Sequence, residues 1–532
     1  MCYHVFLISI DGRNLLSSEQ FDSSIKLDTP VFVISVVLVF VSSGLMVFFP
    51  ETGAQHSLSA MNFILRHAGW LYLIAGILPL LFCGWLAFGR YGDIKFGAAD
   101  EKPEYSTLSW VGLMFTGSMG ASLIAWGFAE PIFYLQTPPF GIEPYTPEAF
   151  EWAHVYPIFH WGIAPWAIYC LPAIPVAYML YVRKVPSLKI SDSCEAAMPH
   201  KKNRLAWILL DVFVVIGIVG GVATSIGFGV PLVSSLLSEL FNIEDNILLQ
   251  LVVIALWTAI FGTSSYLGLK RGIKVLSDFN VWLFFILMAI VLLAGPTLYL
   301  LNITVNTVGL WLNNFIRMSF WTDPIQQGGF PEAWTIFYWA WWIAYAPMMG
   351  LFFARISRGR TIKQVVLGVI GFGCLGTFLF LSLAGGYVLY LEGAGLLDAS
   401  GILHNQGMSK LVSAVIAQLP FPAIVLAITT IASLIFYATT FDSAAFVLAS
   451  ICTLGLKGDQ EPKKENRLIW ALALGFVAVG LALAGGFETV KSMSVISSLP
   501  VIPILVMMCV TLVFWLRSDF PKLSEKKPVT LD

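Results

Sequence analysis

Long apolar runs separated by short polar segments dominate the chain. A bilayer core of about 30 Å needs a helix of about 20 apolar residues, and the hydropathy pattern predicts twelve such helices. Their predicted ranges are 30–50, 69–89, 108–136, 153–182, 206–239, 246–267, 275–301, 331–355, 362–391, 420–454, 466–487 and 493–516. Several runs exceed about 25 residues, so we expect those helices to tilt, bend or extend beyond the bilayer. The pattern predicts an all-α integral membrane protein.

Two shorter amphipathic stretches lie between predicted spans, at 306–319 and 407–417. Helices with one apolar and one polar face are typical of segments that lie in the plane of the membrane interface. We expect both to run along the outer surface, and an ordinary polar loop is the alternative for the second.

Basic residues occur almost entirely in every second loop. Of the 30 Lys and Arg residues, only Arg66, Arg317, Lys410 and Lys491 fall in the other set of loops. Loops rich in Lys and Arg remain in the cytoplasm. The distribution therefore predicts that both termini are cytoplasmic, and the start of the chain shows no signal-peptide pattern.

Composition excludes several classes of protein. Hydrophobic residues make up 58% of the chain, charged residues 12%, and the net charge is −2, whereas soluble domains are about 25% charged. A basic nucleic-acid-binding protein is excluded, so we expect no nucleic-acid partner. The seven cysteines form no Cys-x-x-Cys pair, and no motif of a nucleotide hydrolase, serine hydrolase or metalloprotease occurs. We expect neither an enzyme nor a resident metal or cofactor.

Aromatic residues gather inside two of the predicted spans rather than only at their ends. The fourth span contains Trp161, Trp166 and Tyr169, and the eighth contains Trp341, Trp342 and Tyr345. Two facing aromatic groups can form a cage for a cation without N–H donors, and each desolvated ring contributes about 0.5–2 kcal/mol. The alternative is that these rings only fill the helical core.

The third and tenth spans contain the other unusual polar features. The small residues 117–122 permit either close helix packing or a broken helix whose free carbonyl groups bind an ion or substrate. Thr439 and Thr440 offer hydroxyl oxygens that suit Na⁺, or they bond back to their own helix. Asp442 requires a partner or a water-lined position, because a buried carboxylate is costly in a membrane.

Taken together, these segments resemble the betaine/carnitine/choline transporter (BCCT) family. The most specific match is FYWAWWIAYAPMMGLFFARISRGRT at 337–361. WGFAEPIFY at 126–134, HWGIAPWAIY at 160–169 and the run at 439–443 also agree, in the order found in the family. The resemblance extends over essentially the whole chain from about residue 30.

The resemblance implies a LeuT-type fold, in which two peripheral helices precede two inverted five-helix repeats. The transporter domain would cover 30–516, with the first repeat at about 108–301 and the second at about 331–516. Residues 1–29 and 517–532 would then be a cytoplasmic N-terminal segment and a short cytoplasmic tail. Family members are commonly homotrimers, so a homotrimer is also expected.

The resemblance also implies site residues. The substrate site would comprise Trp161, Trp166, Tyr169, Trp341, Trp342, Tyr345 and Met119, and the ion site Ser118, Met119, Thr439 and Thr440. The expected function is secondary active transport, in the cell (inner) membrane, of a quaternary ammonium compound such as glycine betaine, choline or carnitine, or of a similar sulfonium compound. Na⁺ is the expected coupling ion.

Three departures from the family's symporters favour an alternative, sodium-independent exchange of carnitine-like substrates. Residues 119–122 read Met-Gly-Ala-Ser instead of Met-Gly-Ile-Gly, Tyr345 stands where many betaine carriers have Trp, and Met349 matches the exchangers. The exchangers, however, fill the sodium site with an Arg from the seventh span. Asn280 aligns with that position, so sodium-coupled symport is the preferred interpretation.

Overall fold

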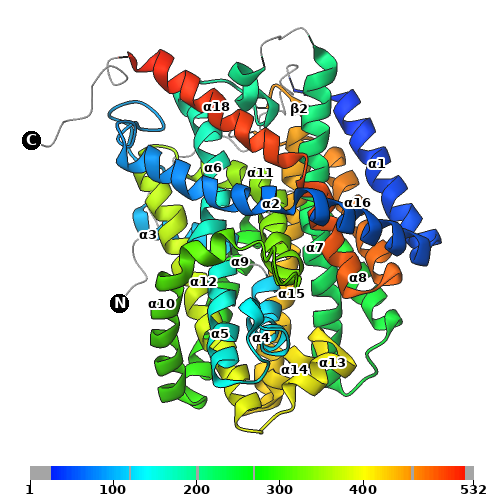
Figure 1. Cartoon of the computed structure of the whole chain (residues 1–532). Helices are drawn as coiled ribbons and strands as arrows, with labels where there is room; N and C mark the ends of the chain where they lie inside the picture. Colours follow the sequence, from blue (N-terminus) through cyan, green and yellow to red (C-terminus); the bar gives the residue numbers. More distant parts are fainter. Residues whose placement is uncertain (1–24, 119–120, 199–202, 268–269, 457–459, 522–532) are drawn as a thin grey trace, which may run out of the picture.

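The structure is a computed structural model that describes residues 25–118, 121–198, 203–267, 270–456 and 460–521 (Figure 1). Its α-helices are α1 (Thr29–Phe48), α2 (Pro50–Phe88), α3 (Thr107–Ser118), α4 (Ala121–Gln136), α5 (Pro147–His160), α6 (Ile163–Ala177), α7 (Arg204–Phe241), α8 (Ile247–Leu267), α9 (Lys270–Ala294), α10 (Thr297–Phe320), α11 (Ile336–Ile356), α12 (Ile362–Gly393), α13 (Ala399–Gln406), α14 (Met408–Ala417), α15 (Pro422–Ile451), α16 (Lys464–Ala484), α17 (Phe487–Ser498) and α18 (Val501–Asp519). Short helical turns are η1 (Pro139–Gly141), η2 (Tyr178–Val182), η3 (Ser191–Ala197) and η4 (Pro331–Thr335), and the strands are β1 (Lys26–Leu27) and β2 (Thr453–Leu454).

Within this part of the chain, ten helices are long and apolar enough to cross a membrane, and eleven if α9 and the bent α10 form one span. The protein is therefore a multi-pass membrane protein, as predicted. The number twelve is not confirmed, because the predicted span 108–136 is divided between α3, of 12 residues, and α4, of 16 residues. Neither helix alone reaches the length of about 20 residues needed to cross. Residues 119–120 between them lie outside the described residues.

Several predicted spans are broken where proline or glycine interrupts the helix. The seventh was predicted to reach residue 301, but α9 ends at Ala294, and α10 leaves it at an angle of 107°. Gly295 and Pro296 explain the break, since proline restricts the residue before it and donates no hydrogen bond. The predicted amphipathic stretch 306–319 is thus part of α10, and the second such stretch forms α14.

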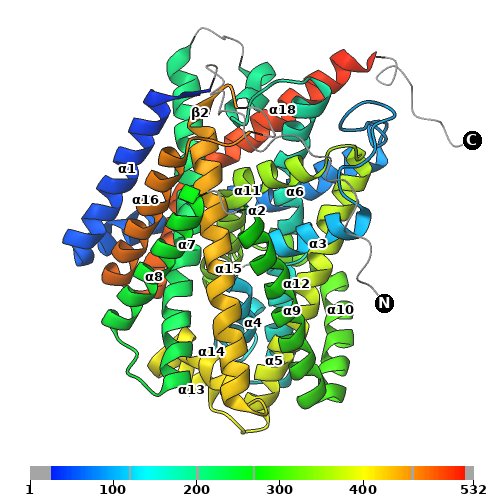
Figure 2. The ribbon, with the colours of Figure 1, turned by 180° about the vertical axis from the view of Figure 1, so that it is seen from behind.

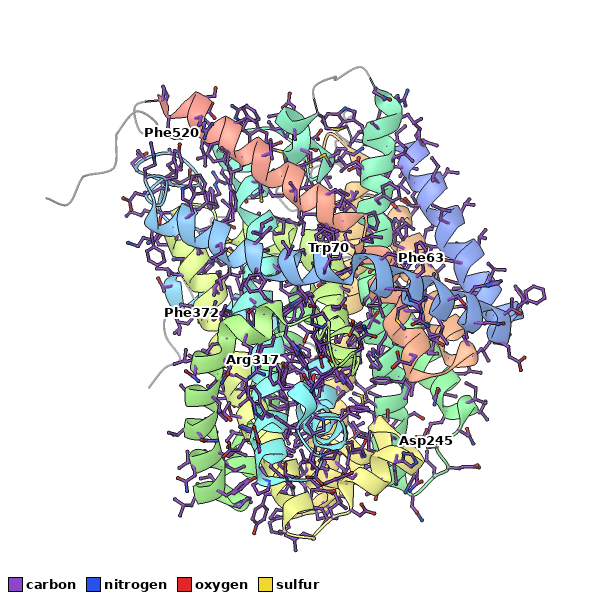
Figure 3. The ribbon with its side chains drawn as sticks, in the orientation of Figure 1. Phe63, Trp70, Asp245, Arg317, Phe372 and Phe520 are labelled. Carbon is purple, nitrogen blue, oxygen red and sulfur yellow. The ribbon has the colours of Figure 1, made fainter. Side chains whose placement is uncertain are left out.

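The interior of the bundle is built around α6 and α11, which pack extensively against each other and against α12 and α7 respectively. Figure 1 places α1 and α16 along one edge of the molecule and α10 near the other, and Figure 2 shows α15 between α7 and α9, against both of which it packs. α2 carries large apolar side chains outward: Phe63 is 65% exposed and Trp70 57% exposed (Figure 3). Apolar side chains on the outside and a closely packed interior are what a lipid-exposed bundle requires.

A buried ion pair network ties together the end of the molecule that carries β2 (Figure 1). Lys189 Nζ pairs with Asp28, the residue before α1, and lies 2.8 Å from Asp211 Oδ2 on α7. Next to Asp28, β1 pairs antiparallel with β2 at the end of α15. Asp245, in the loop between α7 and α8, and Phe520, directly after α18, are labelled toward opposite ends of the molecule in Figure 3.

Candidate functional site

The fourth predicted span is broken in the middle, and the break positions its first tryptophan. α5 ends at His160, and α6 begins at Ile163. Gly162 between them has φ −88° and ψ −145°, and a Cβ atom there would lie 2.6 Å from the carbonyl oxygen of Ile158. Only glycine fits this close approach without a shift. The break leaves Trp161 as the residue after the last turn of α5, with its side chain buried.

Five of the six predicted substrate-site aromatic residues form one buried cluster, here called the cage: Trp161, Trp166, Tyr169, Trp341 and Trp342. The ring of Trp342 is central, with centroid distances of 4.5 Å to Tyr169, 5.4 Å to Trp161 and 5.8 Å to Trp166. The rings of Trp161 and Trp341 are 5.9 Å apart and nearly perpendicular. The spacing within α6 and α11 and the packing of these two helices therefore bring together rings that are far apart in sequence.

Tyr345, the sixth residue, lies about one turn beyond Trp342 on α11. Its hydroxyl is 2.8 Å from Ser225 Oγ on α7. Met119, the remaining predicted residue, lies outside the described residues, and of Ser118 only the backbone is described.

Protein acceptors fix the orientation of three cage tryptophans. Trp161 Nε1 donates to Glu130 Oε2 at 3.0 Å, and Trp341 Nε1 donates to the carbonyl oxygen of Gly221 at 3.1 Å. Trp166 Nε1 donates to Thr377 Oγ1 at 3.3 Å. These acceptors lie on α4, α7 and α12, so each ring is oriented by a different helix.

The indole N–H of Trp342 differs from the other three. It is buried and has no hydrogen-bond partner among the described residues. A buried donor without a partner loses the free energy of about 1–3 kcal/mol that solvation would provide. A ligand with an acceptor oxygen would recover it. The cage thus offers ring faces for a cation and one free N–H for an anionic or polar group.

Glu130 is a residue of the candidate site that the sequence analysis did not name. Its Oε1 accepts from the Tyr134 hydroxyl at 2.5 Å and lies 3.1 Å from His160 Nδ1. The other ring nitrogen of His160 lies 3.0 Å from Thr335 Oγ1. A carboxylate with three neighbouring donors is well stabilised in a low-dielectric interior. The available signal was that Glu130 is the one acidic residue in the predicted span 108–136.

The predicted ion-site threonines lie on α15, which packs against α9. Thr439 Oγ1 donates to the carbonyl oxygens of Ile435 and Phe436, both at 3.0 Å, so its hydroxyl hydrogen points back to its own helix. Thr440 is half-buried. Asp442 Oδ1, whose partner the sequence did not reveal, accepts from Ser265 Oγ at 2.7 Å.

Asn280 on α9 is buried, and neither polar atom of its amide has a partner among the described residues. An amide oxygen is a hard ligand of the kind that alkali and alkaline-earth cations prefer. The amide oxygen of Asn280 has no partner among the described residues and is therefore free to bind a small cation near α9.

Comparison with known proteins gives the family. Residues 30–521 match the family model described as BCCT, betaine/carnitine/choline family transporter. The chain belongs to the BCCT family. This confirms the resemblance seen in the sequence.

Named relatives are similar to this BCCT member over nearly their whole length. A carnitine transporter of Acinetobacter baumannii is 31% identical over 506 residues, which are 95% of this chain and 92% of that protein. The glycine betaine transporter OpuD of Bacillus subtilis is 34% identical, over 87% of this chain and 89% of that protein. An ectoine/hydroxyectoine transporter of Virgibacillus pantothenticus is 32% identical, over 94% and 99%. These relatives are transporters, in agreement with the absence of enzyme motifs noted above.

Proposed function

We propose that this BCCT member is a secondary active transporter of a quaternary ammonium or sulfonium compound, such as glycine betaine, choline or carnitine. The observation that carries the proposal is the cage. It consists of buried rings from α6, α11 and the break before α6, beside the indole N–H of Trp342, which has no partner among the described residues. A trimethylammonium group has no N–H donors, so it loses little hydrogen bonding when it leaves water, and three or four rings are sufficient to attract it.

The two ends of such a substrate fit different parts of the site. The methylated cation would contact the ring faces of Trp161, Trp341 and Trp342. The carboxylate or hydroxyl at the other end would accept from Trp342 Nε1. Glu130 lies behind Trp161, bonded to its N–H, and contributes negative potential on the same side without contacting the substrate. We propose no covalent step.

Na⁺-coupled symport with alternating access is the proposed mode of transport. Thr439, Thr440, Ser118 and Met119 remain the proposed ion ligands. The amide of Asn280, which has no partner among the described residues, supports an oxygen-lined position on α9. Each charge that enters down a membrane potential of 100 mV provides about 2.3 kcal/mol. Sodium-independent exchange is the alternative, and the sequence departures at 119–122, Tyr345 and Met349 favour it.

The twelve-span layout, the repeats at about 108–301 and 331–516 and the cytoplasmic termini, 1–29 and 517–532, are part of the same proposal. So are the homotrimer and the cell inner membrane. The basic loops support the orientation, and protease accessibility in right-side-out and inside-out vesicles measures it directly. Cross-linking of the protein in its native membrane measures the oligomeric state.

Uptake of radiolabelled glycine betaine, choline, carnitine and dimethylsulfoniopropionate into proteoliposomes tests the proposal. We expect uptake into empty liposomes that requires an inward Na⁺ gradient. Uptake only into liposomes preloaded with substrate, and indifferent to Na⁺, would establish exchange instead. Absence of transport of every compound under both conditions would refute the proposed substrate class.

A further inference from the structure

Lys491 is a buried cation next to the cage. Its position among the sparse basic residues of one set of loops suggested an outer loop, but the residue lies in α17, and its side chain is only 3% exposed. Its partner is Glu488, whose side chain is 51% exposed and whose Oε1 lies 3.1 Å from Lys491 Nζ. The pair therefore reaches from the interior to the surface.

Three aromatic rings surround the Lys491 ammonium. Nζ lies 5.1 Å from the ring centroid of Trp334 and 5.3 Å from those of Phe337 and Phe487. A cation within about 6 Å of a ring face is attracted by the ring quadrupole, most strongly where water is excluded. We name the rings of Trp334, Phe337 and Phe487 the second box. It shares no residue with the cage.

The second box and the cage are continuous. Phe337 and Trp341 lie four residues apart on α11, and their rings stack at 5.7 Å. Trp126 bridges the two groups, with centroid distances of 5.9 Å to Phe337 and 6.2 Å to Trp341. Trp334 and Trp341 are seven residues apart, a separation of about 10 Å along a helix. A cation leaving the cage in this direction would meet the second box next.

We propose that Trp334, Phe337 and Phe487 form a second cation site and that Lys491 is its built-in occupant, which excludes the transported cation from it. The inference rests on the proposed substrate class. A tethered group has an effective concentration in the millimolar range, so it excludes a dilute external cation. The ammonium has three N–H donors and needs Glu488 as acceptor, whereas a methylated ammonium needs none and fits the emptied box.

Equilibrium dialysis of the purified full chain with radiolabelled tetramethylammonium tests the inference. We expect one bound probe per chain for the wild type and two for Lys491→Met, which keeps an unbranched side chain but removes the charge. Lys491→Arg keeps a cation in the box and should bind one. Lys410→Met is the matched control, because Lys410 also pairs with a glutamate, Glu239, but is 38% exposed; it should bind one.

Two further variants separate the second box from the cage and from misfolding. Trp342→Leu should weaken binding of the probe to the cage, and adding Lys491→Met to this variant should add a bound probe whose Kd does not depend on Trp342. If Lys491→Met does not fold, Glu488→Gln provides a second test. It removes the charged partner of Lys491 at the exposed end of the pair, so the ammonium should leave the second box more readily and a second, weaker bound probe should be measured.

A single bound probe in both Lys491→Met and Glu488→Gln would overturn the inference, as would two in the wild type. No probe on the wild type but one on Lys491→Met would support the second box, and it would count against the cage and hence against the proposed function.

Discussion

Replacing Trp342 separates the two contributions proposed for the cage. Its ring is the one closest to Tyr169 and Trp161, at 4.5 and 5.4 Å, and its N–H is unpaired among the described residues. Trp342→Phe keeps an aromatic face and removes the donor. Trp342→Leu removes both. The comparison uses two ligands: glycine betaine has a carboxylate, and tetramethylammonium has none.

The expected magnitudes follow from the contacts. Loss of one desolvated ring costs about 0.5–2 kcal/mol, which raises Kd about 2- to 30-fold. Loss of a hydrogen bond to a charged group costs about 1.5–3 kcal/mol, or about 10- to 150-fold in Kd. Trp342→Phe should therefore weaken glycine betaine binding strongly and tetramethylammonium binding little, and Trp342→Leu should weaken both.

Equilibrium binding in detergent, with uptake into proteoliposomes beside it, measures these effects. Trp470→Leu is the matched control, because Trp470 is equally large, fully buried in α16 and also has an unpaired indole N–H among the described residues. It should lower thermal stability by a similar amount without changing Kd. Unchanged Kd for both ligands in Trp342→Leu would refute the cage, and equal losses for both ligands in Trp342→Phe would refute the donor role.

Three further changes test the surroundings of the site. Glu130→Gln removes the charged acceptor that orients Trp161, so Kd for glycine betaine should rise about tenfold or more. An unchanged Kd in the equilibrium binding assay would show that the Trp161 ring holds its position without the carboxylate. Thr440→Ala should raise the Na⁺ concentration for half-maximal uptake about tenfold, and Thr440→Ser should restore it; a flat Na⁺ response in both would place the ion elsewhere. Lys189→Met should lower the free energy of unfolding by about 3–5 kcal/mol, because it leaves buried carboxylates unpaired; Arg183→Gln, at an exposed pair, should lower it by at most about 1 kcal/mol, and equal thermal shifts would contradict the difference in burial.

The sequence predicted span positions well where an apolar run ends at a clear polar signal. The ninth span was predicted at 362–391, and α12 covers Ile362–Gly393, with Thr361 and Gln364 forming a capping box at its start. Breaks were harder to predict. Trp161 and Gly162 do not interrupt the apolar run, so hydropathy did not mark the end of α5. Gly295-Pro296 did indicate a helix break, but the predicted span followed the length of the apolar run and continued past it.

The candidate site was predictable in its residue types but not in its anchors. The aromatic residues of α11, of α6 and of the break before α6 were recognisable from sequence, and the structure brings five of them together. Their role in binding remains a prediction. The acceptors Glu130, Gly221 and Thr377 come from three other helices, so only tertiary packing reveals them. Lys491 was misplaced because a charge in an apolar sequence usually indicates a loop, and here aromatic rings stabilise it in the interior.

The anchoring of the tryptophans has a thermodynamic consequence. Trp161, Trp341 and Trp166 are each hydrogen-bonded to a different helix. If the cage binds substrate as proposed, its affinity depends on the positions of α4, α7 and α12 relative to α11. Linkage is reciprocal: if a shift of one of these helices weakens binding by some factor, bound substrate resists that shift by the same factor. A substitution on the far side of α12 can therefore change Kd without touching the ligand, and the substrate itself acts as an effector of helix position.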